Sequence, residues 1–347
     1  MATRVTVIVV RVENLRPHPN ADRLELCDVL GWQMAVPKGA YQNGDKLVYF
    51  PPDTLIPATW ADAWNVRQYL KGKDKDRVGR IQLRGEASFG LAVRLPPDQD
   101  WAVGTNVAEF FGATKWEPPV NPCGGDPDEP HPLFDKYTDI ENLRNYPAVL
   151  RDGEEVVCTE KIHGTNCRVG LIEGVEMAGS MELRRKRPAD EAQLAINTYW
   201  FPWTVPGVRE LVHAIAARRQ AKQVIIFGEV FGGSVQSLDY GLPKGRGLGF
   251  RAFDLLVDRQ FLEYDEFEAV CCEFGVPIAP VLYRGSFSLA TVRAASEGPS
   301  TVGGAHVREG VVVRPVRQRT DAQVGRVVMK YLGDAYLLSQ ASDFKDV

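Results

Sequence analysis

A proline-rich stretch near the end of the first third of the chain limits the folds that this sequence can adopt. Residues 113–132 contain six of the 23 prolines. Proline lacks a backbone N–H and fixes φ, so it is poorly tolerated inside helices and central strands. The stretch therefore predicts a linker or a loop that lies along the surface. A length of 347 residues suggests two domains. We expect a β module at residues 1–115, a linker at 116–135 and a second domain at 136–347.

The part before the linker is expected to consist of short strands. Apolar residues alternate with polar ones at 5–12 and 23–30, and the dipeptide Asn43-Gly44 is typical of a hairpin turn. A further short apolar run follows at 46–50. Short strands with turns every ~8–12 residues are typical of a small barrel or sandwich.

The part after the linker mixes helical and strand periods, so we expect an α+β fold of antiparallel sheets with flanking helices. In residues 206–221, apolar side chains recur at helical spacing, and basic residues stand at the end, where they suit a helix C-terminus. Thr138 and Asp139 are candidate caps for a short helix at 138–150. Segments rich in β-branched and aromatic residues predict strands at 154–162, 167–174, 223–233, 249–257 and 309–315.

The composition is that of a soluble globular protein, with 44% hydrophobic and 25% charged residues. The sequence shows no apolar run near the ~18 residues of a membrane span, no signal-peptide pattern and no paired cysteines of a metal site. We therefore expect a cytoplasmic protein with free thiols and no membrane association. The net charge of −4 does not indicate nucleic acid, but basic residues cluster at 77–84, 184–187 and 314–326. Such clusters can follow nucleic-acid phosphates, although a solvated face is the commoner explanation.

The segment at 160–166, EKIHGTN, is the candidate for covalent chemistry. A predicted strand ends near Lys161, and Gly164 allows a tight turn and a close approach of the backbone to a ligand. A lysine in this position suits a nucleophile that attacks a phosphate. Free lysine is protonated at neutral pH because its pKa is ~10.4, so positive charge from Lys330 or a divalent cation is expected nearby to favour the neutral amine. An ordinary surface lysine is the alternative.

Four further segments follow in order: FGEVFG at 227–232, FRAFD at 250–254, REGVVVRP at 308–315 and VMK at 328–330. With 160–166, they resemble motifs I, III, IIIa, IV and V of the covalent nucleotidyltransferases, the superfamily of RNA ligases, DNA ligases and mRNA-capping enzymes. The pattern Lys-x-His-Gly-x-Asn resembles RNA ligases, because the other two classes usually show Lys-x-Asp-Gly. A β module before this domain resembles the Deinococcus and Naegleria type of RNA ligase, whose module is an OB-fold. The resemblance covers nearly the whole chain, and 235–241 also looks like a segment of this family.

The resemblance implies an ATP-dependent RNA ligase that joins 3′-hydroxyl and 5′-phosphate ends at nicks in duplexes. The implied reaction runs through a lysyl-AMP and an adenylylated RNA 5′ end, with ATP as AMP donor and Mg²⁺ or Mn²⁺ as metal cofactor. The expected partner is RNA or an RNA-containing nicked duplex, and we expect a monomer. A capping-type guanylyltransferase and a non-catalytic RNA-binding protein with an OB module are the alternatives. The joint presence of Lys161, Glu229, Glu309 and Lys330 speaks against the second.

The resemblance also implies roles for individual residues. The implied catalytic residues are Lys161 as the nucleophile, His163, Glu309 and Lys330. Glu309 is the implied metal ligand, Lys330 contacts the α-phosphate, and His163 assists the later transfer to RNA. The implied ATP-binding residues are Glu160, Lys161, Ile162, Asn166, Glu229, Phe253 and Lys330. Arg184 and Lys186 are candidates for RNA binding.

One position departs from the family pattern. Many relatives carry two lysines separated by one residue in motif V, whereas Val328 stands at the first place here. Arg326 lies two residues earlier, on the same face of a strand, and is a candidate replacement. Structural roles are the alternatives for single residues: a core aromatic for Phe253, edge-strand charges for Glu229 and Glu309, and structural positions for His163 and Asp254.

Overall fold

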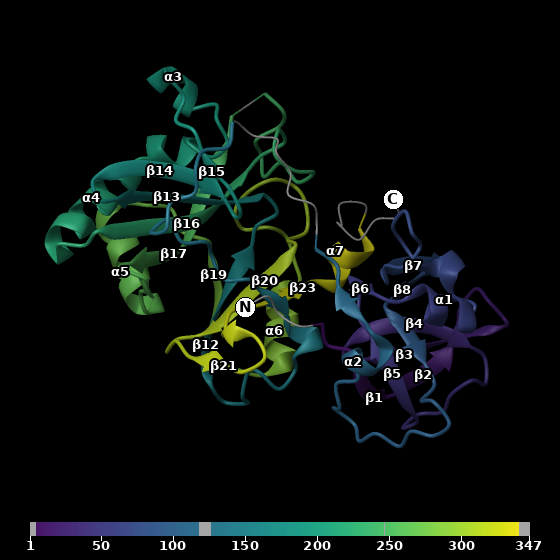
Figure 1. Cartoon of the computed structure of the whole chain (residues 1–347). Coiled ribbons are helices and arrows are strands. Elements are labelled where there is room, and N and C mark those ends of the chain that lie inside the picture. Colours follow the sequence, from purple (N-terminus) through teal and green to yellow (C-terminus); the bar gives the residue numbers. More distant parts are fainter. Residues whose placement is uncertain (1–4, 118–125, 246, 340–347) are drawn as a thin grey trace. The chain divides into compact units, whose positions relative to one another are not determined.

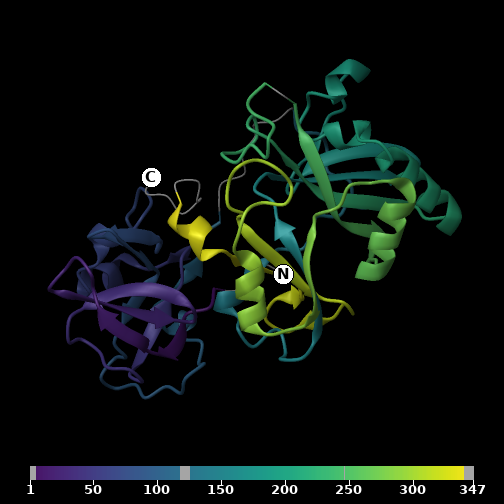
Figure 2. The same ribbon diagram turned by 180° about the vertical axis from the view of Figure 1, so that it is seen from behind.

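The computed structural model describes residues 5–117, 126–245 and 247–339, which fall into two compact units. The first unit takes the described residues up to 117 together with Leu143–Pro147, and the second takes the others. Figures 1 and 2 show their elements from opposite sides. The domain bounds expected from the sequence stay a prediction, and part of the expected linker, at 118–125, lies outside the described residues.

The first unit is built from short antiparallel strands. One sheet has the order β1-β5-β9 and another the order β2-β3-β4, while β7-β8 and β6-β10 are two-stranded. The strands are β1 (Ile8–Arg11), β2 (Glu13–Pro17), β3 (Leu24–Val29), β4 (Trp32–Pro37), β5 (Lys46–Phe50), β6 (Thr54–Leu55), β7 (Arg80–Leu83), β8 (Glu86–Phe89), β9 (Leu91–Val93) and β10 (Thr114–Lys115). The helical segments are α1 (Ala58–Ala63), η1 (Arg67–Tyr69) and α2 (Ala108–Phe111). Val48, Phe50 and Phe111 belong to the core of this unit.

The second unit contains two larger sheets. The five-stranded sheet has the order β11-β23-β20-β12-β19, and the six-stranded sheet has the order β15-β14-β13-β16-β17-β18. The first consists of β11 (Glu141–Asn142), β12 (Glu155–Lys161), β19 (Val281–Ser286), β20 (Gly310–Pro315) and β23 (Met329–Leu332). The second consists of β13 (Thr165–Ile172), β14 (Val175–Ser180), β15 (Arg184–Arg185), β16 (Gln223–Phe231), β17 (Gly249–Val257) and β18 (Gln260–Phe261), and a small pair is formed by β21 (Thr320–Asp321) and β22 (Gly325–Arg326). The predicted α+β class is confirmed.

Helices cover one face of the six-stranded sheet. α4 (Val208–Arg219) and α5 (Tyr264–Phe274) pack there against Val224 and Ile226 (Figure 1). Burying a valine- or leucine-sized side chain contributes roughly 1.5–3 kcal/mol to the stability of the fold. α4 confirms the helix predicted at 206–221, and its apolar stripe is buried. α6 (Leu289–Ser296) is the yellow-green helix against β20 in Figure 2. The remaining described helical segments are α3 (Glu191–Leu194), α7 (Asp334–Leu338), η2 (Leu143–Asn145) and η3 (Phe201–Thr204). Among the described residues, no helix has the length and the apolar character that are needed to span a bilayer.

The short helix predicted at 138–150 is wrong. β11 pairs in parallel with β23 at the start of this range, and the single 3₁₀ turn η2 follows it. Pro147 explains why the turn does not continue as a helix. It lacks a backbone donor, and it disfavours the helical conformation for the residue before it.

Candidate active site

The turn after Lys161 carries the chain from one sheet of the second unit to the other. β12 ends at Lys161 in the five-stranded sheet, and β13 begins at Thr165 in the six-stranded sheet. Gly164 lies within this turn, where a Cβ atom would stand 2.2 Å from the carbonyl oxygen of Val230. Because a side chain could not fit at that distance, the glycine is required for the passage between the sheets.

Strand register places two lysines on one face of the five-stranded sheet. Thr159 pairs with Val312, and Val312 pairs with Lys330. Directly paired residues share a face, and so do residues two apart along a strand. Lys161 and Lys330 therefore lie on the same face, two strands apart. Figure 1 shows the three strands β12, β20 and β23 side by side.

The Lys161 ammonium is paired with a buried carboxylate. Its Nζ lies 2.7 Å from Glu309 Oε1, and Glu309 is only 3% exposed. His163 Nδ1 lies 3.6 Å from Oε2 of the same carboxylate. Burial opposes ionisation of Glu309, but Lys161 and His163 outweigh it and hold the pKa of Glu309 below its ordinary value. The structure thus places a negative charge directly beside Lys161, while Lys330 lies on the same sheet face. The effect of positive charge on the Lys161 amine stays a prediction.

The imidazole of His163 is enclosed by residues that the sequence analysis did not assign. Its Nε2 lies 3.1 Å from Ser237 Oγ, and its Nδ1 lies 3.4 Å from the Tyr336 hydroxyl. The backbone N–H of His163 donates to the Tyr240 hydroxyl at 2.6 Å. The family resemblance of 235–241 was the available signal for Ser237 and Tyr240. Nothing in the sequence pointed to Tyr336, which lies in α7.

Glu229 and Asn166 face each other on neighbouring strands of the six-stranded sheet. They are directly paired between β13 and β16, and the Glu229 carboxyl accepts a hydrogen bond from the Gly164 N–H at 3.2 Å. Burial raises the pKa of Glu229 to about 8, an effect that Lys161 opposes and Glu309 reinforces. The buried Asn166 Oδ1 accepts no hydrogen bond from any described residue. The pair therefore offers a protonated carboxyl group and an open amide oxygen at neutral pH.

Replacing Glu229 by glutamine is expected to make the protein more stable at high pH than at low pH, relative to wild type. In the unfolded chain the Glu229 carboxyl group loses its proton near pH 4.5, whereas in the folded chain it keeps the proton up to a pH of about 8. Between these values the folded state binds more protons, so stability falls as the pH rises. Glutamine does not ionise and avoids this loss. Urea denaturation at about pH 5 and about pH 8 measures the difference, and an equal effect of Glu229→Gln at both would contradict the raised pKa.

Two predicted ATP-binding residues are packed inside the second unit. Glu160 is 1% exposed, and its carboxylate accepts hydrogen bonds from the Ser300 hydroxyl and from the N–H and hydroxyl of Thr301. Ile162 is buried in an apolar cluster that includes Phe231. Their part in ATP binding stays a prediction.

A bulge in β17 determines the position of Phe253. The pairing of β16 with β17 shifts register between Phe227 and Gly228, which leaves Phe253 as an extra residue. Its half-buried ring packs against two apolar clusters and lies edge-on to Tyr137, with 4.9 Å between ring centroids. A half-buried aromatic ring can contribute to the core and still offer part of its surface to a ligand.

Asp254 is the centre of a buried charge cluster. Its side chain is fully buried, and its Oδ2 accepts hydrogen bonds from the Tyr137 hydroxyl at 2.9 Å, Arg314 at 2.9 Å and Arg326 at 2.7 Å. Arg314 also donates to the Phe253 carbonyl oxygen at 2.9 Å. The cluster therefore holds the backbone at the bulge. Arg326, the candidate replacement for the first motif V lysine, is engaged here as a partner of Asp254.

The two candidate RNA contacts differ in their surroundings. Arg184 in β15 pairs with Asp128 at 3.0 Å and donates to the Glu129 carbonyl oxygen. Lys186 is exposed and forms no ion pair with any residue that the structure describes. Of the two, Lys186 is thus the side chain with freedom to meet a phosphate.

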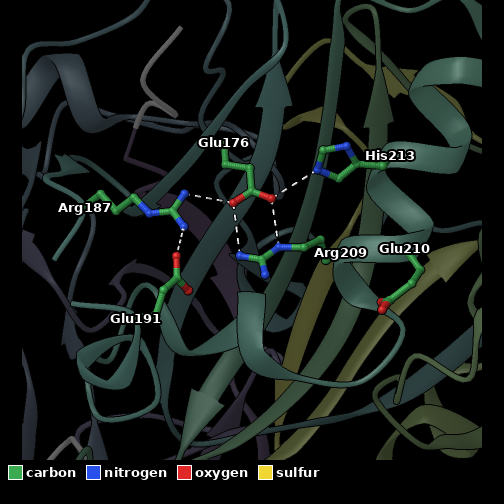
Figure 3. Close-up of a pocket in the computed structure, with 6 residues that line it drawn as sticks. All are labelled: Glu176, Arg187, Glu191, Arg209, Glu210 and His213. Atoms are coloured by element: carbon green, nitrogen blue, oxygen red, sulfur yellow. Dashed lines mark hydrogen bonds and ion pairs between the residues drawn. The ribbon is translucent and has the colours of Figure 1, made fainter. Parts of the chain in front are cut away.

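A surface depression of about 550 Å³ lies elsewhere on the second unit. It is lined by Glu176, Arg187, Glu191, Arg209, Glu210 and His213. Figure 3 shows Glu176 contacted by Arg187, Arg209 and His213, while Arg187 also meets Glu191. None of the lining residues is a predicted catalytic residue. The basic side chains that line the depression are paired with acidic ones, so we interpret them as a structural network of ion pairs and not as a ligand site.

The candidate metal ligand is Glu309. Its Oε2 is buried and accepts no hydrogen bond from the described residues, although Oε1 is occupied by Lys161. No group of three or more His, Cys, Asp or Glu side chains among the described residues could hold a metal ion. Mg²⁺ is usually held by one or two carboxylates together with phosphate oxygens and water. The donor set fits such a cation, bound through Glu309 and otherwise by a ligand's phosphates.

Comparison with known families agrees with these motifs. A family model described as RNA ligase matches residues 154–332, slightly more than half of the chain. The chain belongs to the RNA ligase family. An OB-fold domain model matches residues 6–95 of this RNA ligase, which confirms the OB-like module predicted before the second domain. The predicted enzyme class is likewise confirmed.

Solved structures show the same fold over nearly the whole chain. Naegleria gruberi RNA ligase with PPi matches with a TM-score of 0.70 and 24% identity, covering 96% of this RNA ligase and 98% of that chain. A variant of it with ATP and Mn gives the same values. An apo variant matches with a TM-score of 0.72 and 23% identity, covering 96% and 97%. No curated protein sequence matches at a significant level.

Proposed function

We propose that this RNA ligase uses ATP to join a 3′-hydroxyl to a 5′-phosphate through a lysyl-AMP on Lys161. The observation that supports this most is the position of Lys161, paired with the buried Glu309 and on the same sheet face as Lys330. The Naegleria structures with ATP and Mn support ATP and a divalent cation as cofactors. The partner is RNA or an RNA-containing nicked duplex, bound by a monomer. The five described free cysteines suit a cytoplasmic location.

In the first step, the Lys161 amine attacks the α-phosphorus of ATP. A P–N bond forms, the bond to the β-phosphate oxygen breaks, and pyrophosphate leaves. The Lys161 ammonium group must first release its proton to water and separate from Glu309, since the ammonium form has no lone pair to donate. Lys330 meets the negative charge on the α-phosphate. Mg²⁺ or Mn²⁺ at Glu309 neutralises phosphate charge when bound.

The nucleotide contacts follow from the arrangement of the two sheets. Phe253 stacks on adenine with the exposed part of its ring. Glu229 donates a hydrogen bond from its protonated carboxyl group, and the Asn166 Oδ1 accepts one, so the pair suits ribose and phosphate groups. Glu160 and Ile162 flank Lys161 and are buried, so they support the nucleotide site from within the unit.

In the second step, an oxygen of the RNA 5′-phosphate attacks the phosphorus of the lysyl-AMP. The P–N bond breaks, and the Lys161 amine takes up a proton. In the third step the 3′-hydroxyl attacks the 5′-phosphorus, the new phosphodiester forms, and AMP leaves. His163 assists the second step by donating from its imidazole to the incoming phosphate. Lys186, and Arg184 after release from Asp128, contact the RNA backbone.

His163→Ala is expected to reduce sealing more than adenylylation. Lys161 alone makes the covalent bond, whereas the imidazole acts when RNA arrives. Single-turnover rates of adenylylation with labelled ATP, and of AMP transfer from pre-adenylylated protein to a 5′-phosphorylated nicked RNA, measure the two steps separately. An equal loss in both rates would contradict this role for His163.

The proposed substrate is tested with two nicked duplexes that differ in the sugars at the 3′-hydroxyl side. The reacting 3′-oxygen must lie in line with the leaving AMP, and a misplacement of about 1 Å can cost roughly 100-fold in rate. We expect ribose ends to be sealed much faster than deoxyribose ends, because sugar pucker sets this position. Equal sealing of the nick with deoxyribose ends would contradict the proposal that RNA is the substrate.

Labelling with nucleotides separates the alternative functions. Labelling of the protein by GTP instead of ATP would indicate a capping-type reaction, and no labelling would indicate a non-catalytic binding protein.

A further inference from the structure

The segment from η1 through β7 in the first unit carries a strong excess of positive charge. Residues 67–84 contain seven basic and two acidic side chains, on a chain whose net charge is −4. The basic residues are Arg67, Lys71, Lys73, Lys75, Arg77, Arg80 and Arg84. None of them belongs to the motif segments that carry Lys161, Glu229, Phe253, Glu309 and Lys330.

Part of this segment forms a small hairpin with two lysines at its tip. The Lys71 N–H donates to the Arg77 carbonyl oxygen at 2.7 Å, and the Arg77 N–H donates back at 3.2 Å. Lys73 and Lys75 lie in the loop between them, and both are exposed. Neither lysine side chain has an ion-pair or hydrogen-bond partner among the residues that the structure describes. We call residues 67–77 the basic hairpin.

The arginines of the basic hairpin have a different function, which is to hold its shape. Arg67 forms a two-pronged pair with Asp62, with both nitrogen–oxygen distances at 2.6 Å. The Arg77 guanidinium lies 4.0 Å from the ring centroid of Trp116. The Ile56 N–H, directly after β6, donates to the Asp76 carbonyl oxygen of the hairpin at 3.0 Å. The lysines therefore stand on a well-anchored support.

An exposed aromatic ring stands at the base of the same hairpin. Tyr69 is 45% exposed, whereas the next residue, Leu70, is buried in the core of the unit. An exposed ring and exposed ammonium groups on the same hairpin are the two elements of sequence-independent strand binding. Bases stack on aromatic faces, and lysines follow the phosphates.

We propose that the basic hairpin binds the RNA substrate, with Lys73 and Lys75 on backbone phosphates and Tyr69 stacked on an unpaired or terminal base. This inference rests on the proposed RNA ligation. The charge and exposure of the hairpin favour an RNA strand over a mononucleotide. Both lysines are exposed to solvent on a loop, where a strand can reach them. By contrast, Arg184 and Arg187 of the second basic cluster are already neutralised by carboxylates.

The test measures RNA binding directly, without ligation. Full-length protein is titrated into a fluorescein-labelled nicked RNA duplex with an unpaired flanking nucleotide, and anisotropy is followed over a range of NaCl concentrations. Each phosphate contact contributes about 0.7–0.9 to the slope of log K against log salt. Lys73→Ala/Lys75→Ala should therefore lower the slope by about 1.4–1.8. Tyr69→Ala should weaken binding at least about fivefold.

The matched control is Lys38→Ala/Lys222→Ala, which removes two exposed lysines elsewhere. We expect it to leave the slope unchanged, and Lys73→Arg/Lys75→Arg to keep wild-type binding because the charge is retained. A slope for the alanine pair equal to that of the control would overturn the proposal. So would a loss of ATP labelling with unchanged RNA binding, since the hairpin would then serve the nucleotide. Failure of the proposed ligation appears separately, as an absence of ATP labelling in the wild type.

Discussion

Asp254→Ala is expected to lower the free energy of unfolding by about 3–5 kcal/mol, because it leaves two buried guanidinium groups without their carboxylate. Asp254 is fully buried and meets both Arg314 and Arg326. The Tyr137 hydroxyl also loses its acceptor. Urea denaturation of the purified protein measures this loss.

The control for this prediction is Asp152→Ala, which removes an exposed aspartate of the same unit. Surface changes of this kind usually alter stability by less than about 0.5 kcal/mol. If Asp254→Ala behaved like Asp152→Ala, the charge cluster would not stabilise the fold. Because Arg314 also holds the Phe253 carbonyl, Asp254→Ala should in addition weaken ATP binding in protein that remains folded.

Lys161→Arg is expected to abolish covalent adenylylation while leaving the protein folded. The guanidinium keeps the positive charge beside Glu309, but it does not lose its proton in proteins and so cannot attack phosphorus. Lys161→Ala should also abolish adenylylation, and it should destabilise the protein by roughly 3–5 kcal/mol because the buried Glu309 loses its cation. Labelling by α-labelled ATP and urea denaturation measure the two effects. Adenylylation that persisted in Lys161→Arg would place the nucleophile elsewhere.

Local patterns were sufficient for much of the fold. Runs of β-branched and aromatic residues predicted the strands around Lys161 and Glu229, and helical spacing predicted α4, because both signals lie within a few residues of sequence. The helix predicted at 138–150 failed for a different reason. Parallel pairing of Glu141 and Asn142 with β23 involves residues almost two hundred positions away, which no local pattern reports.

The candidate site was predictable in its motif residues and not in their partners. Asp254 meets arginines that lie 60 and 72 residues further along the chain, and His163 meets Tyr336 at a separation of 173 residues. Only the fold brings such residues together. Basic clusters were similarly ambiguous, since the sequence does not show that Arg184 is paired with Asp128, whereas Lys73 has no carboxylate partner in the part of the chain that the structure describes.

The most direct test of the account follows one AMP group through the reaction. The protein is incubated with α-labelled ATP, the label is located by peptide mass spectrometry, and the complex is then chased with a 5′-phosphorylated nicked RNA duplex. The account predicts label on Lys161 alone, then on the RNA 5′ end, and finally in free AMP as the strands are joined. Label on another residue, or RNA that is joined while the label stays on the protein, would contradict it.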